Sequence, residues 1–417
     1  MATPTDSDLR RRPEPRLRAA LRAVYVAFIL AGVAGASWAS RIPQIRDGLE
    51  LSPSRLGLVL LALAVGSIVS LVLAGQIVAH FGSRRTVAAM AALLGIALSF
   101  VGVGYHLGVP AVVAALLFFG FANGAWDVAM NVQGAIVERR LGKAVMPRFH
   151  AGYSVGTVTG ALVGAGAVHV GISVTTHLII TAVVSAVIVI VSVRAFVPDD
   201  AASPPAVAAS DPGPVESADP VAGPSSGLRR TLAAWREPRT VLIGVFVLAF
   251  AFTEGAGIDW ISVAMIDGYG TSATVGTLAF AVFLAAMTTG RWFGPGLLDR
   301  FGRVPVVRVL AAVSVLGLAL FVFGPVAWIA FAGALLWGLG ASLGFPVGMS
   351  AAADEPAHAA SRVSVVATIG YCAFLGGPPL IGFLGDHVTV LKGLIAVAVL
   401  LAVATALAGA VREPRPR

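Results

Sequence analysis

Apolar stretches of about 20 residues recur twelve times along this 417-residue chain. An α-helix of that length crosses the hydrocarbon core of a bilayer, where every backbone N–H and C=O must be hydrogen-bonded within the protein. Apolar residues make up 57% of the chain and charged residues only 12%, against about 25% charged in a soluble domain. We therefore predict an all-α polytopic membrane protein with twelve transmembrane helices. The stretches lie at 19–39, 55–79, 86–106, 110–137, 149–170, 175–196, 240–266, 272–298, 304–324, 326–350, 362–385 and 388–411.

The basic residues predict how these helices are oriented. Lysine and arginine collect in cytoplasmic loops. With the N-terminus inside, only Arg41, Arg46, Arg55 and Lys392 of the 29 basic residues fall in outside segments, and Arg291 falls within a span. We therefore predict that both termini are cytoplasmic. The net charge of +8 then reflects this orientation and contact with anionic membrane lipids, not nucleic-acid binding. The preference for arginine and alanine is typical of a bacterium, so we expect the cytoplasmic (inner) membrane.

One long polar segment divides the spans six and six. The stretch "VPDDAASPPAVAASDPGPVESADPVAGPSSGLRR" (197–230) is rich in Ala, Pro, Ser and Asp, the composition of a disordered linker. The predicted organisation is a cytoplasmic tail at 1–18, a six-helix half at 19–196, a disordered cytoplasmic linker at 197–239, a second six-helix half at 240–411 and a tail at 412–417.

The two halves carry a short repeat at equivalent places. "HFGSRR" (80–85) follows the second span and "RFGRVP" (300–305) follows the eighth, an offset of 220 residues. Shortly afterwards "LLGIAL" (93–98) matches "VLGLAL" (315–320) at an offset of 222. The repeat predicts pseudo-symmetric halves, an architecture in which substrates bind between the halves near the middle of the membrane.

Twelve spans, a central loop and these hairpins make the chain resemble the major facilitator superfamily (MFS) of secondary transporters. The family's signature segment, which helps lock the cytoplasmic gate, is divided between the halves. "GQIVAHFGSRR" (75–85) has Ala79 at the acidic position, and "PGLLDRFGR" (295–303) has Pro295 at the first glycine. The resemblance implies that the gate residues are Gly75, Gly82, Arg84, Arg85, Asp299, Arg300, Gly302 and Arg303.

Three further segments look like a bacterial branch, the YbjJ-like permeases: "WASRIP" (38–43), "NGAWDVAMN" (123–131) and "GYCAFLGGPPLIGFLGD" (370–386). The branch supplies no substrate. The chain lacks the fourth-span arginine of many proton-coupled members and the fifth-span Gly-Pro pair of drug/proton antiporters. Glycines instead recur along the fifth span, either for close helix packing or as a hinge, at Gly152, Gly156, Gly160 and Gly164.

The fourth span carries polar residues through the middle of the membrane. Asn123, Asp127, Asn131 and Gly134 share one helix face, and Asp127 lies within about 5 Å of the span's centre. Lipid cannot satisfy these groups, so the face should meet protein or a water-filled cavity. The alternative to a functional cavity is an interhelical hydrogen-bond ladder that only fastens the bundle.

The seventh span carries two further acids in "FTEGAGIDW" (252–260). Glu254 lies at its centre, and Asp259 lies about 7 Å further out. The family resemblance implies that the first, fourth, seventh and tenth spans line the central cavity. A buried carboxylate can take up and release a proton as its exposure changes, so we expect proton coupling at Glu254 first and Asp127 second. The competing role is direct binding of a substrate's hydroxyl or ammonium groups.

Other candidates have ordinary alternatives. Trp38 and Arg41 line the cavity, or form an aromatic belt and a surface arginine. Trp260 and Trp337 stack on a substrate ring, or serve as interface anchors or packing residues. Arg291 is expected to join Asp299 in the inner gate, with His150 as a further gate candidate. Glycines and Pro346 predict a kinked tenth span.

We conclude from the sequence that the chain is a secondary transporter of a small, hydrophilic solute that works by alternating access. Export of drugs or secondary metabolites by proton antiport is the alternative, and a non-transporting sensor is a remote one. Absence of nucleotide, serine-protease and zinc motifs argues against an enzyme and against direct use of ATP. We expect a monomer without metal or cofactor, whose partners are the solute, protons and lipids.

Overall fold

The computed structural model describes residues 15–199, 232–355 and 358–413. Within these ranges the chain forms helices and turns and no strands, and eleven helices are long and apolar enough to cross a membrane. One of them, α3 (Pro53–Gly104), has 52 residues and contains both the second and the third predicted span. The chain therefore has the twelve-helix fold that the sequence predicts. Most of the predicted linker, residues 200–231, lies outside the described residues.

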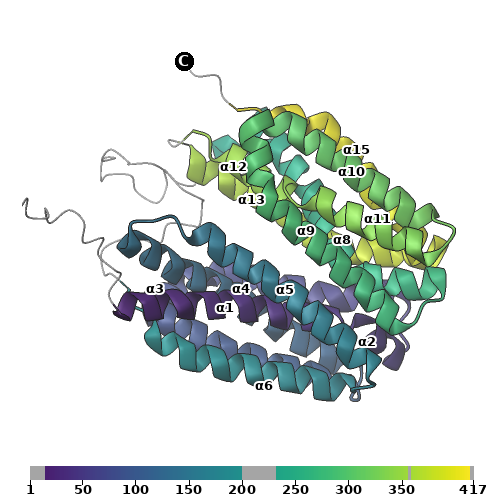
Figure 1. Ribbon diagram of the computed structural model, residues 1–417, viewed down its shortest axis with the longest axis horizontal. Coiled ribbons are helices and arrows are strands. Elements are labelled where there is room, and N and C mark those ends of the chain that lie inside the picture. The colour runs from purple at the N-terminus through teal and green to yellow at the C-terminus, as the bar shows by residue number, and fades with distance from the viewer. Residues whose placement is uncertain (1–14, 200–231, 356–357, 414–417) are drawn as a thin grey trace, which may run out of the picture.

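The helices form two bundles that lie side by side (Figure 1). The N-terminal half contains α1 (Pro15–Ala39), α2 (Ile42–Gly48), α3, α4 (Val109–Leu141), α5 (Met146–His169), α6 (Val174–Ser192) and the turn η1 (Val193–Ala195). The C-terminal half contains α8 (Pro238–Tyr269), α9 (Ala273–Phe301), α10 (Arg303–Phe323), α11 (Ala327–Ala341), α12 (Gly344–Ala352), α13 (Ala359–Val388), α14 (Val390–Gly393), α15 (Ile395–Leu407) and the turn η2 (Ala408–Val411).

The repeated hairpins have the same backbone conformation. Gly82 has φ 78° and ψ 158°, and Gly302, 220 residues later, has φ 77° and ψ 164°. Residues with a Cβ are strongly disfavoured in this region, so only glycine turns the chain there without strain. At Gly82 the chain turns sharply and a new helix begins at once, so α3 consists of two helices, the second and third spans, on either side of this turn. The matching geometry confirms the internal repeat.

Small residues bring the helices of each half into close contact. A Cβ on Gly66 of α3 would lie 2.0 Å from the carbonyl oxygen of Leu117 in α4. On α5, a Cβ on Gly156 or Gly160 would lie 2.0 or 2.5 Å from backbone oxygens of α1. Such approach is what small-residue patterns allow in membrane helices. Since α5 is continuous from Met146 to His169, its glycines act as packing residues, not as a hinge, in this conformation.

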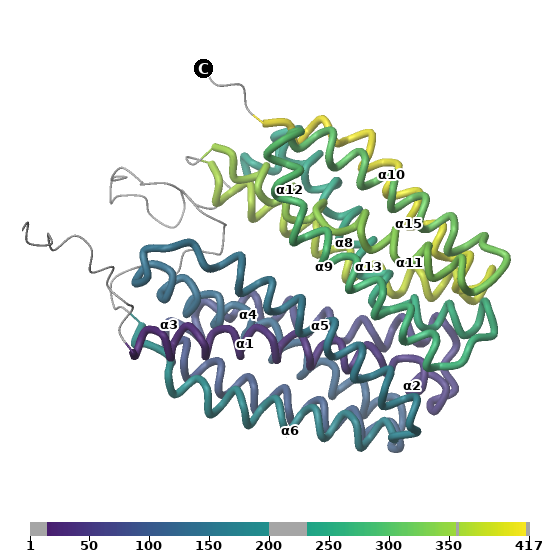
Figure 2. Tube along the Cα trace, in the orientation of Figure 1, coloured from purple at the N-terminus to yellow at the C-terminus, as the bar shows by residue number. Residues whose placement is uncertain are grey.

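The halves contact each other mainly through two equivalent pairs of helices, α3 with α13 and α5 with α9. We call the end of the molecule that holds Pro15 and Glu413 the termini end, and the opposite end the α2 end. At the α2 end, a Cβ on Gly57 of α3 would lie 2.4 Å from the carbonyl oxygen of Pro378 in α13. The traces diverge toward the termini end (Figure 2). The halves are therefore closed together at the α2 end and apart at the termini end.

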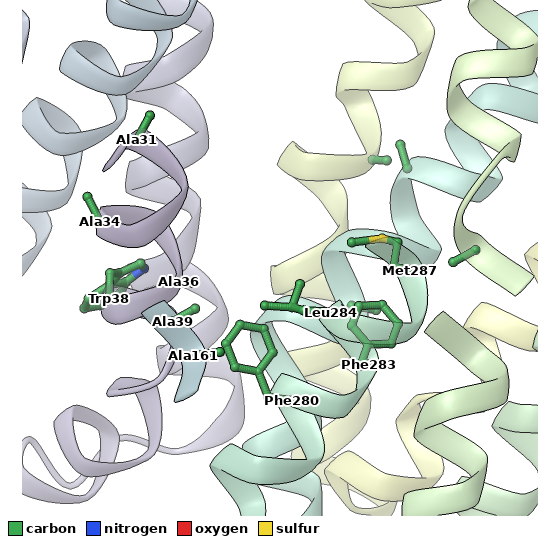
Figure 3. Close-up of a cluster of buried hydrophobic side chains, with 14 of the residues drawn as sticks. Ala31, Ala34, Ala36, Trp38, Ala39, Ala161, Phe280, Phe283, Leu284 and Met287 are labelled. Carbon is green, nitrogen blue, oxygen red and sulfur yellow. The ribbon is translucent and has the colours of Figure 1, made fainter. Parts of the chain in front are cut away.

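An apolar cluster seals the closed region. Figure 3 shows Ala161 of the N-terminal half beside Phe280 of α9, with Leu284 next to Phe280 and Trp38 further away on α1. All four belong to one buried cluster, and each is at most 4% exposed. Burial of these side chains indicates close packing of α5 against α9 at this level.

The tenth span is broken, as the sequence predicts. Helix α11 ends at Ala341 and α12 begins at Gly344, with Ser342 and Leu343 between them. Pro346 lacks the N–H that would bond to the carbonyl four residues before it, which belongs to Ser342. The break therefore leaves a free carbonyl inside the C-terminal half.

Candidate functional site

Asp127 lies close to the centre of α4, a helix of 33 residues. Its side chain is exposed, although the residues around it on α4 are mostly buried. The Asn131 amide donates to the backbone oxygen of Asp127 at 2.8 Å and to its carboxylate Oδ1 at 3.2 Å. Among the described residues, neither Asp127 nor the two asparagines Asn123 and Asn131 makes a hydrogen bond to another helix. The contacts described thus contain no interhelical ladder.

Charged and phenolic groups from both halves lie near Asp127. The Tyr153 phenol of α5 lies within electrostatic range of Asp127, and also of Glu254 and Arg291 in the C-terminal half. Tyr371 of α13 lies within range of Asp127 as well. Groups from both halves, Tyr153 of α5 and Tyr371 of α13, thus lie near Asp127. We call the space bounded by these five residues the central chamber.

Glu254 lies at the middle of α8 and forms an ion pair with Arg291 of α9. The Arg291 guanidinium donates to Glu254 Oε2 at 2.7 Å, and the two side chains are 30% and 19% exposed. In this conformation Arg291 pairs with Glu254 and makes no contact with Asp299. Eight residues separate Arg291 and Asp299 on one helix, a rise of about 12 Å, whereas Glu254 faces Arg291 from the neighbouring helix. Arg291 therefore belongs to the central chamber.

A second acceptor holds Arg291 in place. Its Nε donates to the Ser342 carbonyl at 3.3 Å, the carbonyl that Pro346 leaves without a partner in its own helix. The broken tenth span thus supplies a fixed dipole for the arginine. The sequence contains a signal for this contact. An arginine within a span needs an acceptor for its N–H groups, and a proline four residues after a serine leaves the serine carbonyl without its helical donor.

Asp259 is half-buried and has no hydrogen bond or ion pair with any other described residue.

His150 of α5 is exposed, and its ring centroid lies 5.2 Å from that of Phe28. It also lies within electrostatic range of Arg291. His150 therefore borders the central chamber on the side of the termini end.

Most of the remaining gate candidates lie at the surface of the termini end. Arg84, Arg85, Asp299 and Arg300 are exposed, and the Arg300 guanidinium lies 5.2 Å over the Phe301 ring. Gly75 lies in α3 with nothing near the position of a Cβ. The gate candidates make no bonds between the halves within the part of the chain that the structure describes.

Arg303 takes part in an ion-pair cluster that sequence reasoning missed. It pairs with Asp354 at 2.7 Å, and Arg239 pairs with the same carboxylate at 2.9 Å. The Asp354 side chain is only 6% exposed. Both partners belong to the C-terminal half, so this cluster ties α8, α10 and the segment after α12 together.

Three aromatic candidates are buried in packing contacts. Trp260 and Trp337 are fully buried and Trp38 is 4% exposed. Trp337 packs edge-on against Phe283 and Phe321, with ring centroids 5.3 and 5.7 Å away. In this conformation none of the three can stack on a solute, and none forms an exposed aromatic belt. In this conformation Trp260 and Trp337 are packing residues, one of the alternatives that the sequence left open.

The surface-arginine alternative for Arg41 is wrong. Arg41 is 2% exposed, because the segment between α5 and α6 folds over it. Its Nε donates to His177 Nδ1 at 2.9 Å, and its Nη2 donates to the Ile172 carbonyl at 3.1 Å. Arg41 thus fastens the first span to the fifth-to-sixth connection within the N-terminal half.

Polar contacts also join the halves at the α2 end, and we call them the α2-end latch. Arg46 of α2 donates hydrogen bonds to both carboxylate oxygens of Asp267 in α8, and its Nη2 lies 3.0 Å from Oδ1. Asp386 of α13 accepts from the Ser54 backbone N–H and the Ser52 hydroxyl, both at 3.3 Å. The partners are at least 221 residues apart, and no local pattern reveals such pairs.

Comparisons with known proteins agree with this architecture. The sequence profile of the Major Facilitator Superfamily matches residues 23–372. An uncharacterised MFS-type transporter of Yersinia pestis is 30% identical over 385 residues, 91% of this chain and 93% of that protein. An uncharacterised transporter of Sinorhizobium fredii is 31% identical over 375 residues, 90% of this chain and 93% of that protein.

Among solved structures, a mutant of the nucleoside transporter NupG superposes with a TM-score of 0.74 at 15% identity, over 94% of this chain and 98% of that one. At this identity the likeness shows the shared fold and nothing about the solute. The profile match and the two relatives extend over most of the chain, and they agree with the repeated hairpins and the two six-helix halves. The chain is a multi-pass membrane protein that belongs to the Major Facilitator Superfamily.

Proposed function

We propose that this protein carries a small, hydrophilic solute across a bacterial cytoplasmic membrane by alternating access. The supporting observation is the central chamber, in which the exposed carboxylate of Asp127 lies at mid-span between the halves, opposite the Glu254–Arg291 pair. A charged group at that depth is costly unless it serves a pathway. The resemblance of three segments to the YbjJ-like permeases supports placing the chain in that branch.

The orientation follows from the positive charge at the termini end. Arg84, Arg85 and Arg300 are exposed there, and the cytoplasmic side of a membrane protein is the one that collects such residues. We infer that the termini end is cytoplasmic and the α2 end extracellular. In this conformation the central chamber then faces the cytoplasm.

Asp127 is the better candidate for proton coupling, which reverses the order expected from the sequence. Glu254 is compensated by Arg291, so a proton on Glu254 would leave the arginine charge without its partner. Asp127 has only the Asn131 amide as its hydrogen-bond partner among the described residues. A proton on Asp127 therefore neutralises a charge without breaking an ion pair.

The proposal is tested with purified protein in two steps. A thermal-shift screen of sugars, organic acids, peptides, nucleosides and lipophilic cations identifies a ligand, because a molecule that binds the folded state raises the melting temperature. Flux of that ligand is then measured in proteoliposomes, both as exchange at equal pH and as accumulation driven by a pH gradient. We expect Asp127→Asn to abolish accumulation and to retain exchange.

The control is Glu254→Gln, which removes an acid of the same chamber and is expected to retain dependence on the pH gradient. Persistent proton-driven accumulation in Asp127→Asn would exclude this residue as the coupling site. A ligand that binds without any flux would indicate a sensor. Hits confined to lipophilic cations would favour the drug exporter.

A further inference from the structure

The central chamber holds two carboxylates, Asp127 and Glu254, and His150 lies at its border. Its one arginine, Arg291, is already bonded to Glu254 and to the Ser342 carbonyl. Within the described part of the chain, Asp127 has no basic partner. An anionic solute would have to compete with Glu254 for Arg291, whereas a cationic solute meets no competitor at Asp127.

Two other buried arginines cannot supply the missing charge. Arg41 is bonded to His177 and the Ile172 carbonyl inside the N-terminal half. Arg46 is bonded to Asp267 and Asp47 at the α2 end. Both are held by partners away from the chamber, so the charge of Asp127 is left for a proton or a solute.

Two aromatic rings of α13, Tyr371 and Phe374, lie in the same region. Tyr371 is within electrostatic range of Asp127, and its ring centroid lies 6.2 Å from that of Phe374. The Phe374 ring in turn lies 3.5 Å from where a Cβ would stand on Gly255, the residue after Glu254. Aromatic faces beside a carboxylate are the surroundings that bind an ammonium group.

We infer that the transported solute carries a protonated amine, which binds beside Asp127 against these aromatic rings. The inference rests on the proposed function and specifies its substrate class. The half-buried amide of Asn123, one helical turn from Asp127, has no hydrogen bond to another described residue and is available to a hydroxyl group of the solute. The class is thus a small, polar amine, distinct from a neutral sugar or an organic acid.

The charge preference of the chamber can be measured before any solute is known. Asn123→Cys in a Cys372→Ser background places a single thiol one helical turn from Asp127. Its reaction rates are compared for two methanethiosulfonate reagents, a trimethylammonium cation and a sulfonate anion, each normalised to a small thiol in solution. We expect the cation to react faster, and Asp127→Asn to lower the cation-to-anion ratio at least about fivefold. Glu50→Gln, which removes an exposed acid at the α2 end, is expected to leave the ratio unchanged.

A second experiment uses the solute that the thermal-shift screen and the flux measurements identify. We expect replacement of its amine by a hydroxyl to weaken binding at least about tenfold, and Asp127→Asn to remove most of that difference. An anion that reacts as fast as the cation, or a transported solute without an amine, would overturn the inference while transport itself stands. A preserved cation preference without flux of any solute would instead count against the proposed function.

Discussion

At the scale of single residues, pairing of charges decides what a substitution costs. Glu254 and Arg291 are 19% and 30% exposed, so removing one partner leaves the other in a poorly hydrated place. We predict that Arg291→Gln lowers the free energy of unfolding by about 1–3 kcal/mol, less than for a fully buried pair. Glu254→Gln combined with Arg291→Gln should cost less than Arg291→Gln alone. Thermal unfolding in one detergent measures both, and simply additive losses would contradict the pairing.

Glu237, which directly precedes α8, provides a test that depends on pH. Burial raises the pKa of Glu237, but bonds from Thr240 and Arg362 outweigh it and hold this pKa below its usual value. An acid whose pKa is lower in the folded state stabilises the protein above its unfolded pKa, and the stabilisation is lost as the pH falls through the folded pKa.

We therefore predict that Glu237→Gln lowers the melting temperature near pH 7 by about 1–2 °C. The difference from the unsubstituted protein should shrink as the pH falls below the ordinary glutamate pKa of about 4.3 and disappear once the pH is below the lowered pKa of the folded state. Melting curves across this range provide the measurement. Glu413→Gln is the control, because Glu413 is 61% exposed and lies 3.7 Å from its partner Arg303, and we expect no change at either pH. A difference for Glu237→Gln that persists in acid would show that its cause is not the carboxylate charge.

The depth of the acids could be predicted from the sequence, but their partners could not. A helix rises by a fixed distance per residue, so Asp127 and Glu254 fall at mid-span in the chain as in the structure. The partner of Arg291 depends on how α8 packs against α9 and on the carbonyl freed by Pro346. Arg41 is buried by a segment more than 130 residues away. Contacts of this kind leave no periodic signal.

At the scale of elements, the two hairpin glycines make a prediction with an internal control. Gly82 and Gly302 both have positive φ and extended ψ, so an added Cβ is strained there. We predict that Gly82→Ala or Gly302→Ala lowers the free energy of unfolding by about 1–3 kcal/mol. Gly75→Ala changes a helical glycine with open space around it and should be neutral or stabilising by up to about 1 kcal/mol. Thermal unfolding of the three variants measures these differences. Equal losses of stability in Gly75→Ala and Gly82→Ala would refute the explanation by backbone conformation.

The spans themselves could be predicted because length and apolar composition suffice for a membrane helix. The broken tenth span was also predictable, from Pro346 and its neighbouring glycines. The sharp turn between the second and third spans was predictable too, because the Phe-Gly pair at Gly82 recurs at Gly302, where the backbone has the same conformation. Whether the fifth-span glycines bend or pack depends on the neighbouring helix α1, which the sequence of α5 does not specify.

At the scale of the whole molecule, the polar contacts between the halves that the structure describes gather at the α2 end. Arg46 bonds to both carboxylate oxygens of Asp267, and the two side chains are 11% and 40% exposed, so the pair is partly shielded from water. If the halves rock, the α2-end latch must open before the central chamber can face the other side. The repeat in the sequence predicts two halves, but it does not reveal which end is closed. A molecule closed at the α2 end and one closed at the termini end contain the same membrane spans.

Weakening the latch should therefore shift the molecule toward the opposite opening. We predict that Asp267→Asn raises the population open at the α2 end about fivefold to thirtyfold, the range of a 1–2 kcal/mol coupling. Spin labels on Arg55→Cys and Lys392→Cys, exposed positions on opposite halves at that end, report the change as a longer inter-label distance in the Cys372→Ser background. Asp47→Asn is the matched control, because Asp47 bonds to the same arginine at 2.8 Å from within its own half. It should leave the distances almost unchanged, since the bond between the halves remains. Equal shifts in the two variants would mean that Arg46 acts by shaping α2, whereas a shift in Asp267→Asn alone would identify the bond across the halves as what holds the α2 end closed.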